Sequence, residues 1–273
     1  MNQVQLKLLN MLSWFHEFCF KHQLTYFAIG GTLLGAVRHQ GYIPWDDDID
    51  IGMPRTEYNR FIKLMSQTKD DIYTLEVPGE HKDFVYSFSK LYDTTTTLIE
   101  HTRYRTKRGL YLDIFPLDGI GNSLEESKKN FRKINYLNNL ISTKTCAISP
   151  HRSIFKNTTI VLSRCIPNFI LNWQKIVKKV NCLCCSRRYE DCIYVGNLLG
   201  NWHERELVKK EWLGKPILMQ FETIEICCPE NAHAYLTNIY GDYMVLPPQE
   251  KRKPHHDYLC LDLQQSYLNT RRE

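Results

Sequence analysis

The sequence predicts an α/β (α+β) fold, in which helices flank a mixed β-sheet core and a helical insertion interrupts it. Three observations support this. Strand-like and helical patterns alternate over residues 1–122, a helical pattern dominates residues 123–188, and strands return within residues 189–273. We therefore expect a core, an inserted helical subdomain and a C-terminal part that completes the site of the core.

The first elements follow from apolar spacing and turn residues. Apolar side chains recur at helical spacing over residues 6–18, and a short strand is expected over residues 26–29. After the glycines that follow, Thr32 is a suitable N-cap for a helix over residues 33–38. Polar and apolar residues then alternate over residues 48–51, which predicts a half-buried strand.

The later elements are predicted in the same way. Pro54 is expected to begin a helix. Further strands are expected over residues 71–76, 84–91, 97–101 and 110–114. The helical block is interrupted at Pro150 and Pro167. Strands near 217–227, a short helix at 230–239 and an irregular basic tail complete the chain.

Composition restricts the class of protein. Of the 273 residues, 43% are hydrophobic and 24% are charged, as in an average globular domain. The net charge of +5 is too small for a nucleic-acid-binding face, so we expect no nucleic-acid partner. The positive excess gathers at residues 101–108 and 251–256, a pattern that favours sites for an anionic ligand.

Targeting signals and cysteines concern the location of the protein. Residues 1–23 do not resemble a signal peptide, and the chain has no window of 18 uncharged apolar residues. We therefore expect ten reduced thiols and a cytoplasmic protein, peripheral at most at the inner face of the membrane.

Four aspartates occupy five positions in Trp45-Asp-Asp-Asp-Ile-Asp-Ile-Gly52. On a strand, Asp46, Asp48 and Asp50 would share one face. Like charges about 4 Å apart repel by about 4 kcal/mol at an effective dielectric of 20, so such a row needs a cation. Carboxylate oxygens suit Mg²⁺. Two other interpretations stay open: a solvated acidic turn, and an EF-hand loop that runs from Asp46 to Glu57 but has Ile51 where the turn needs glycine.

A glycine turn precedes this cluster. Gly30, Gly31 and Thr32 lie between a predicted strand and a predicted helix, where backbone N–H groups are free to bind a phosphate. The Asp-Ile-Asp-Ile segment begins 16 residues after Thr32. Together the two motifs favour a metal-assisted site for a phosphate compound.

Three segments carry a resemblance to a known family. They are GGTLLGAVRHQGYIPWDDDIDIGMPR at residues 30–55, YLDIFPLDG at 111–119 and YGDYMVLPP at 240–248. They resemble the LicD family, which includes the fukutin-related proteins and lies in the nucleotidyltransferase superfamily of the DNA polymerase β type. The resemblance implies that residues 1–122 form a nucleotidyltransferase-like catalytic core.

The resemblance also implies an activity. It implies a phosphotransferase that moves phosphocholine from CDP-choline to a hydroxyl of a glycan or lipid-linked glycan, such as a teichoic acid, lipopolysaccharide or capsule precursor, and releases CMP. By motif, Asp48, Asp50 and Asp113 would be the catalytic metal ligands for Mg²⁺, with two ions expected and Mn²⁺ as a substitute. Three alternatives stay open: a CDP-ribitol- or CDP-glycerol-dependent polyol-phosphate transferase, a CTP-using nucleotidyltransferase, and a non-catalytic Ca²⁺-binding module.

Further side chains are candidates for binding the donor. Arg38, Lys90 and Arg108 are candidates for phosphate contacts. Glu222, His255 and His256 are candidate acid, base or positioning groups. The rings of Trp45, Tyr240 and Tyr243 are candidates for holding a quaternary ammonium group. A polyol donor would instead use hydrogen-bonding groups such as Asn197, Asn201, His203 and Glu204. Each of these residues also has an ordinary structural interpretation.

Two segments of the helical part have alternative interpretations. Cys182, Cys184, Cys185 and Cys192 lack the paired spacing of common zinc sites, so ordinary thiols are expected there. Residues 153–177 are apolar but interrupted by charges and a proline. They are expected either to form the subdomain core or to lie in a membrane interface.

Overall fold

An eight-stranded mixed sheet forms the centre of the computed structural model, which describes residues 1–150, 152–254, 256 and 258–269. Its main path is β1 (Phe27–Ala28), β2 (Asp50–Pro54), β5 (Lys107–Gly121), β4 (Ser89–Glu100) and β10 (Tyr258–Asp262). Off this path, β3 (Tyr73–Glu76) pairs with β4, and β6 (Tyr194–Asn197) joins β5 to β7 (Leu207–Lys209). Strands β2 and β5 are parallel, whereas the other pairs are antiparallel. The predicted α/β (α+β) class with a mixed sheet is confirmed.

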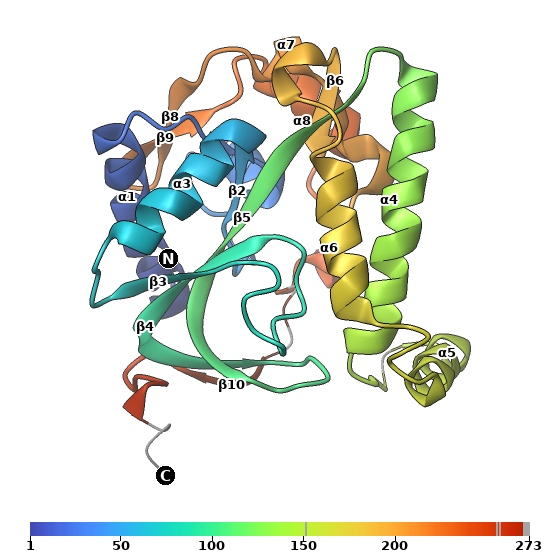
Figure 1. Ribbon diagram of the computed structural model, residues 1–273. Helices are drawn as coiled ribbons and strands as arrows, with labels where there is room; N and C mark the ends of the chain where they lie inside the picture. The colour runs from blue at the N-terminus through green and yellow to red at the C-terminus, as the bar shows by residue number, and fades with distance from the viewer. Residues whose placement is uncertain (151, 255, 257, 270–273) are drawn as a thin grey trace.

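The longest strand, β5, connects the two halves of this sheet (Figure 1). Its first part pairs with β4 and β2, and its last part pairs with β6. The strand predicted over residues 110–114 is thus the middle of a 15-residue strand. The two strands predicted over residues 84–91 and 97–101 are one strand, β4, and residues 84–88 are outside it. A bulge separates its halves, where the Thr96 hydroxyl accepts the N–H of Leu110 at 2.8 Å.

Three helices surround the N-terminal strands. Helix α1 (Gln3–Lys21) starts with a capping box and buries apolar side chains such as Phe15 against the sheet, as predicted. Helix α2 (Gly30–His39) begins earlier than predicted, at the first glycine, and its N-cap is Ile29. Thr32 is therefore not the N-cap, and its hydroxyl instead accepts the N–H of Asp50 at 2.9 Å. Helix α3 (Arg55–Gln67) follows directly after Pro54.

The predicted helical block consists of α4 (Leu124–Thr145), α5 (Ile154–Cys165) and α6 (Trp173–Cys184). Helices α4 and α6 lie side by side, and α5 lies at their far end (Figure 1). The loops at Pro150 and Pro167 separate the helices as expected. Helices α4 and α6 share a hydrophobic cluster with Leu198 and Leu207 of the C-terminal part, so their core is not separate from the rest of the chain. The boundaries predicted at 122 and 188 stay predictions.

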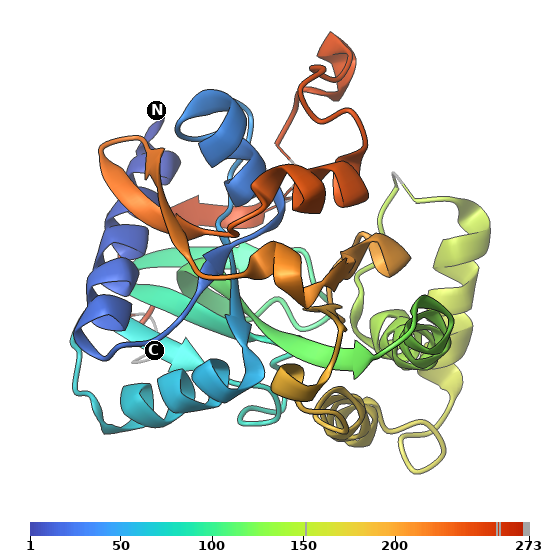
Figure 2. The ribbon, with the colours of Figure 1, turned by 90° about the horizontal axis from the view of Figure 1, so that it is seen from above.

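The C-terminal part contains the predicted hairpin and helix, β8 (Ile217–Phe221) with β9 (Ile224–Cys228) and then α8 (Ala232–Tyr240). It also contains elements that the sequence analysis did not predict: β6, β7, β10, α7 (Lys210–Leu213) and the short 3-10 helices η1 (Tyr189–Asp191), η2 (His203–Glu206) and η3 (Gln249–Lys251). The view from above shows these segments next to α2 and the central strands (Figure 2). The tail that was predicted to be irregular thus contains a strand, β10, which pairs with the end of β4.

Candidate active site

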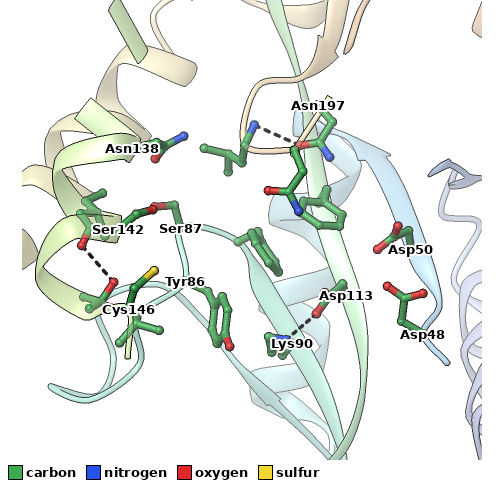
Figure 3. Close-up of a pocket in the computed structure, with 18 of the residues that line it drawn as sticks. Asp48, Asp50, Tyr86, Ser87, Lys90, Asp113, Asn138, Ser142, Cys146 and Asn197 are labelled. Carbon is green, nitrogen blue, oxygen red and sulfur yellow. Dashed lines mark hydrogen bonds and ion pairs between the residues drawn. The ribbon is translucent and has the colours of Figure 1, made fainter. Parts of the chain in front are cut away.

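Three charged side chains form one row across three adjacent strands. Lys90 of β4 is opposite Asp113 of β5, and Asp113 is opposite Asp50 of β2. Residues opposite one another in a sheet project to the same face, so the three side chains meet above the sheet (Figure 3). The Lys90 Nζ lies 3.0 Å from the Asp113 Oδ1. The sheet register thus brings together two aspartates that are 63 positions apart in the chain.

The loop before β2 adds further carboxylates to this row. Asp48 lies beside Asp50 at the edge of the same cavity (Figure 3). His256, from the tail, contacts this loop: its Nδ1 lies 2.9 Å from the Asp47 Oδ1, and its Nε2 lies 3.7 Å from the Asp48 Oδ2. Burial disfavours the imidazolium, but the bond to Asp47 and the charge of Asp48 outweigh it and raise the pKa of His256 to about 9.

Burial and mutual repulsion make these carboxylates hard to ionise. Burial, followed by the charges of Asp48 and Asp113, raises the pKa of Asp50 well above its usual range. Burial also raises the pKa of Asp113 to about 6, although Lys90 opposes the shift. The pKa of Asp46 rises to about 8, through burial and then through Asp48. A cation that binds here would relieve the repulsion.

The two glycines allow the aspartates to approach the start of α2. A Cβ on Gly30, which has φ +54°, would lie 2.8 Å from the Asp50 Oδ2. A Cβ on Gly31 would lie 2.6 Å from the Asp46 Oδ2. Both distances are too short for a side chain. The glycine turn and the aspartate motif, which the sequence analysis paired, are therefore in direct contact, and Gly30 also lines the cavity.

A cavity of about 420 Å³ extends from the aspartates to the inserted helices (Figure 3). One group of lining residues consists of aromatic rings: Tyr86, Phe88, Tyr111, Phe115 and Trp202. A second group consists of side-chain amides: Asn135, Asn138 and Asn139 of α4, with Asn197 and Asn201. The helical insertion, which carried no motif, thus forms a wall of the candidate site.

The Lys90 ammonium is enclosed by acidic and aromatic groups. It lies 3.4 Å from the Glu100 Oε1, 3.2 Å from the centre of the Tyr111 ring and 4.1 Å from that of Tyr86. Burial opposes ionisation of Glu100, but Lys90 and the hydroxyls of Tyr86 and Tyr111 keep the pKa of Glu100 below its usual value. Lys90 therefore lines the cavity, and its charge is already shared by two carboxylates, Asp113 and Glu100.

The other predicted cations lie outside the residues that line this cavity. Arg108 forms a two-pronged ion pair with Glu76. Arg38, at the end of α2, donates to the carbonyl of Tyr243 at 2.7 Å. These bonds give both arginine side chains a structural role within the protein.

The predicted acid or base groups have different outcomes. His256 lines the cavity, whereas Glu222 does not. Glu222 lies in the β8–β9 turn, where its Oε1 accepts the N–H of Tyr42 at 3.0 Å, so it fixes the loop after α2. His255 lies outside the described residues.

The predicted aromatic groups also lie outside the cavity lining. The Arg252 guanidinium lies over the ring of Trp45, with its Cζ 5.6 Å from the centre of that ring. The Tyr243 hydroxyl lies 3.0 Å from the His233 Nδ1. Tyr240 is nearer to the site, because its ring packs at 4.7 Å against Trp202, which does line the cavity.

Sequence reasoning missed two acidic residues of the cavity. Glu206 is almost fully buried, and burial raises its pKa to about 8. Its carboxylate accepts the N–H of Trp202 at 3.4 Å. Glu100 closes the other side of Lys90. Neither lies in a motif, and only the folding of β4 and η2 brings them to the site.

The structure also decides between the alternative metal interpretations. Glu57 accepts the N–H of Thr25 at 3.3 Å and pairs with Arg60, and Asp50 begins a strand, so the segment is not an EF-hand loop. Each of the ten cysteines is free, and none belongs to a group that could hold an ion in the described part of the chain. Among the described residues, Asp47, Asp48 and His256 form a compact group that could hold a metal ion. Their ligand atoms lie within 4.8 Å of one another.

Comparisons with known proteins identify the family of this chain. Residues 23–159 match the family model described as LicD/FKTN/FKRP, nucleotidyltransferase domain. The chain is 30% identical over 275 residues to the lipopolysaccharide cholinephosphotransferase LicD of Haemophilus influenzae, and the match covers 98% of both proteins. Two uncharacterized proteins are similar over shorter regions. That of Rickettsia typhi is 32% identical over 43% of this chain and 44% of its own length, and that of Rickettsia prowazekii is 33% identical over 43% and 52%. The family model covers the motif at residues 30–55 and the motif that contains Asp113. The Haemophilus relative matches over almost the whole length of both proteins. This chain therefore belongs to the LicD family.

Proposed function

We propose that this protein transfers phosphocholine from CDP-choline to a hydroxyl of a cell-surface glycan and releases CMP. As a member of the LicD family, the chain is a phosphotransferase. The observation that carries the proposal is the row of Asp50 and Asp113, flanked by Asp48, at one end of a cavity with aromatic and amide walls. The name of the Haemophilus relative, a lipopolysaccharide cholinephosphotransferase, supports the choice of transferred group and acceptor class.

The carboxylates are suited to a hard divalent cation. They offer oxygen ligands. Burial and neighbouring negative charges raise the pKa values of Asp50 and Asp113, which a bound cation would reverse. We propose that Asp48, Asp50 and Asp113 hold Mg²⁺, with two ions in the complete site and Mn²⁺ as a substitute. The metal would neutralise charge on the donor diphosphate and on the departing CMP.

The protein's own groups would then manage charge and protons. Asp113, which lines the cavity opposite Asp50 in the β2–β5 register, would accept the proton of the acceptor hydroxyl. Lys90 holds this carboxylate in position through the 3.0 Å ion pair. His256 supplies a positive charge at the cavity edge, where it would face the diphosphate.

The choline group requires an apolar, electron-rich surface. A quaternary ammonium has no N–H to donate, so ring faces hold it, with about 0.5–2 kcal/mol for each ring. The rings of Tyr86, Phe88, Phe115 and Trp202 line the cavity. We propose these in place of Trp45 and Tyr243, which lie elsewhere.

The amide wall favours one alternative donor. Asn197 and Asn201, expected to bind a polyol, both line the cavity, together with three asparagines of α4. These amides would bind the hydroxyls of CDP-ribitol or CDP-glycerol, or those of the acceptor glycan. The two uses differ in whether the donor or the acceptor contacts the amides.

The test is donor binding and product analysis. Calorimetric titration with CDP-choline, CDP-ribitol, CDP-glycerol and CTP is expected to give the tightest binding for CDP-choline. Product analysis of the reaction with CDP-choline and a glycan acceptor is expected to find CMP. Phe88→Ala should weaken CDP-choline binding about tenfold more than CMP binding, because the CMP half makes no contact with the choline site. Tyr136→Ala, an exposed ring on α4, is the matched control. Equal losses for both ligands would contradict the choline assignment, and release of pyrophosphate from CTP would indicate nucleotidyl transfer instead.

A further inference from the structure

The outward face of α5 is apolar and uncovered. Ile154 is 85% exposed, Phe155 82% and Leu162 63%, and Val161 is also exposed. The turn after the helix extends this face with Phe169, 87% exposed, and Ile170. Within the helix only Ile160 and Ser163 are buried. We call the six exposed residues the α5 ridge: Ile154, Phe155, Val161, Leu162, Phe169 and Ile170.

The ridge lies at the periphery of the molecule. Figures 1 and 2 both show α5 outside α4 and α6, away from the sheet. Of the two expectations for residues 153–177, a subdomain core explains the buried Trp173 and Val177 of α6 but not the ridge. An exposed apolar ridge of this size indicates an interaction surface.

The segment of the chain that contains the ridge has charged residues of one sign only. Residues 127–189 contain 13 lysines and arginines and neither aspartate nor glutamate. Because the whole chain carries a net charge of +5, the remaining residues together carry −8. Lys156 and Arg164 belong to α5 and Lys175 to α6. Lys156 and Lys175 are exposed, whereas Arg164 is half-buried and donates from its Nη2 to the carbonyl of Cys146 at 2.8 Å. A basic helix with an apolar face is the pattern of a segment that lies in the interface of an anionic membrane.

The ridge is also close to the cavity. The segment between α4 and α5 contributes Cys146, Ala147 and Arg152 to the lining of the cavity that contains the aspartates. A surface that contacted the ridge would therefore lie near the part of the cavity that this segment lines. This position would suit an acceptor that is anchored in lipid.

We propose that the α5 ridge docks this protein onto the surface of an anionic lipid bilayer. The ridge would lie in the headgroup region, with the neighbouring lysines and arginines against anionic headgroups. No helix among the described residues is long and apolar enough to cross a membrane. A second copy of the chain is a poorer occupant, since two surfaces that lack acidic residues would repel each other across a symmetric interface.

Vesicle sedimentation tests this proposal without donor or acceptor, so its outcome does not depend on the proposed reaction. Wild-type protein should bind vesicles with about 30% phosphatidylglycerol at least about tenfold more tightly than pure phosphatidylcholine vesicles. Phe155→Ser with Phe169→Ser should reduce binding to the anionic vesicles at least about tenfold. Phe20→Ser, an 82% exposed ring on α1, is the matched control and should bind as wild type does. Lys156→Glu should reduce binding at least about fivefold, whereas Lys215→Glu, near β8, should not.

A second measurement separates docking from misfolding. Phe155→Trp should become accessible to quenching by brominated lipid in anionic vesicles, whereas Phe20→Trp should not. Equal vesicle binding by the ridge variants and wild type would overturn the proposal. So would a wild-type dimer that Phe155→Ser with Phe169→Ser converts to monomer, since the ridge would then be covered by a second copy.

Discussion

Two aspartates near the β2–β5 pair provide a matched test of the site. Asp50 faces the cavity, and its carboxylate has no cationic partner among the described ion pairs. Asp118, fully buried on β5, accepts from Arg55 Nε at 2.7 Å and Nη2 at 2.6 Å. We predict that Asp50→Asn and Asp118→Asn have opposite effects on activity and stability.

The magnitudes follow from the surroundings of each carboxylate. Asp50→Asn removes a metal ligand and should lower turnover at least about 100-fold, a loss of about 2.7 kcal/mol in transition-state stabilisation. Without metal it should not destabilise the fold, because it relieves a repulsion of up to about 4 kcal/mol between carboxylates about 4 Å apart. Asp118→Asn leaves a buried guanidinium with one acceptor fewer. It should lower the free energy of unfolding by about 3 kcal/mol and leave the turnover of folded enzyme near wild type.

Activity is measured as CMP release from CDP-choline with a lipopolysaccharide acceptor, at a temperature where both variants are folded. Stability is measured by urea unfolding in EDTA. If Asp50→Asn kept more than a tenth of wild-type turnover, the assignment of the metal site to this row would be refuted. If Asp118→Asn abolished turnover at full stability, the division between catalytic and structural aspartates would fail.

Three further predictions follow from the surroundings of the row. Gly30→Ala should weaken Mg²⁺ binding at least about tenfold, measured by calorimetry, because its Cβ would lie 2.8 Å from the Asp50 Oδ2 and displace this proposed ligand. Because folding raises the pKa of Glu206 to about 8 and that of Asp113 to about 6, the stability these groups contribute is complete below about pH 4 and is lost as the pH rises to 8. In EDTA, Glu206→Gln should therefore show a smaller fall in melting temperature between pH 5 and 8 than wild type does. Lys90→Met removes the cation paired with Glu100 and Asp113, so it should lower the free energy of unfolding of the metal-free protein by about 3–5 kcal/mol. Mg²⁺ should restore part of this loss of stability. A loss that is the same with and without Mg²⁺ would show that Lys90 is not coupled to the metal site.

The sequence was most informative where chemistry lies in one continuous motif. The glycine turn and the aspartates of residues 30–55 identified the family, and helical spacing predicted α1, α3 and the three inserted helices. The contact of Gly31 with Asp46 could not be predicted, although both lie in that motif, because it depends on the angle between α2 and the loop before β2.

Residues whose role depends on long-range pairing were predicted poorly. Glu100 reaches Lys90 because β4 continues through a bulge, whereas the sequence pattern suggested two strands. The sequence pattern of the tail appeared irregular because basic residues precede the five-residue strand β10. The pairing of β10 with β4 depends on residues far apart in the chain, and it brings His256 to Asp47. The expected donor rings failed for a similar reason: Trp45 adjoins the aspartates in sequence, but its ring packs against Arg252.

The balance of charge at the site explains why distant parts of the chain are needed to hold it. Five buried or half-buried aspartates on one loop and two strands would repel one another in a metal-free protein. Lys90 from β4 offsets the charge at one end of the row, and His256 from the tail offsets it at the other. At the loop itself, Gln5 of α1 donates from its Nε2 to the carbonyl of Asp46 at 2.9 Å and so fixes the backbone that carries the carboxylates. The first helix and the tail just before the last strand, both outside the carboxylate motif, thus contact the same short loop. This coupling is consistent with a relative that matches over 98% of the chain.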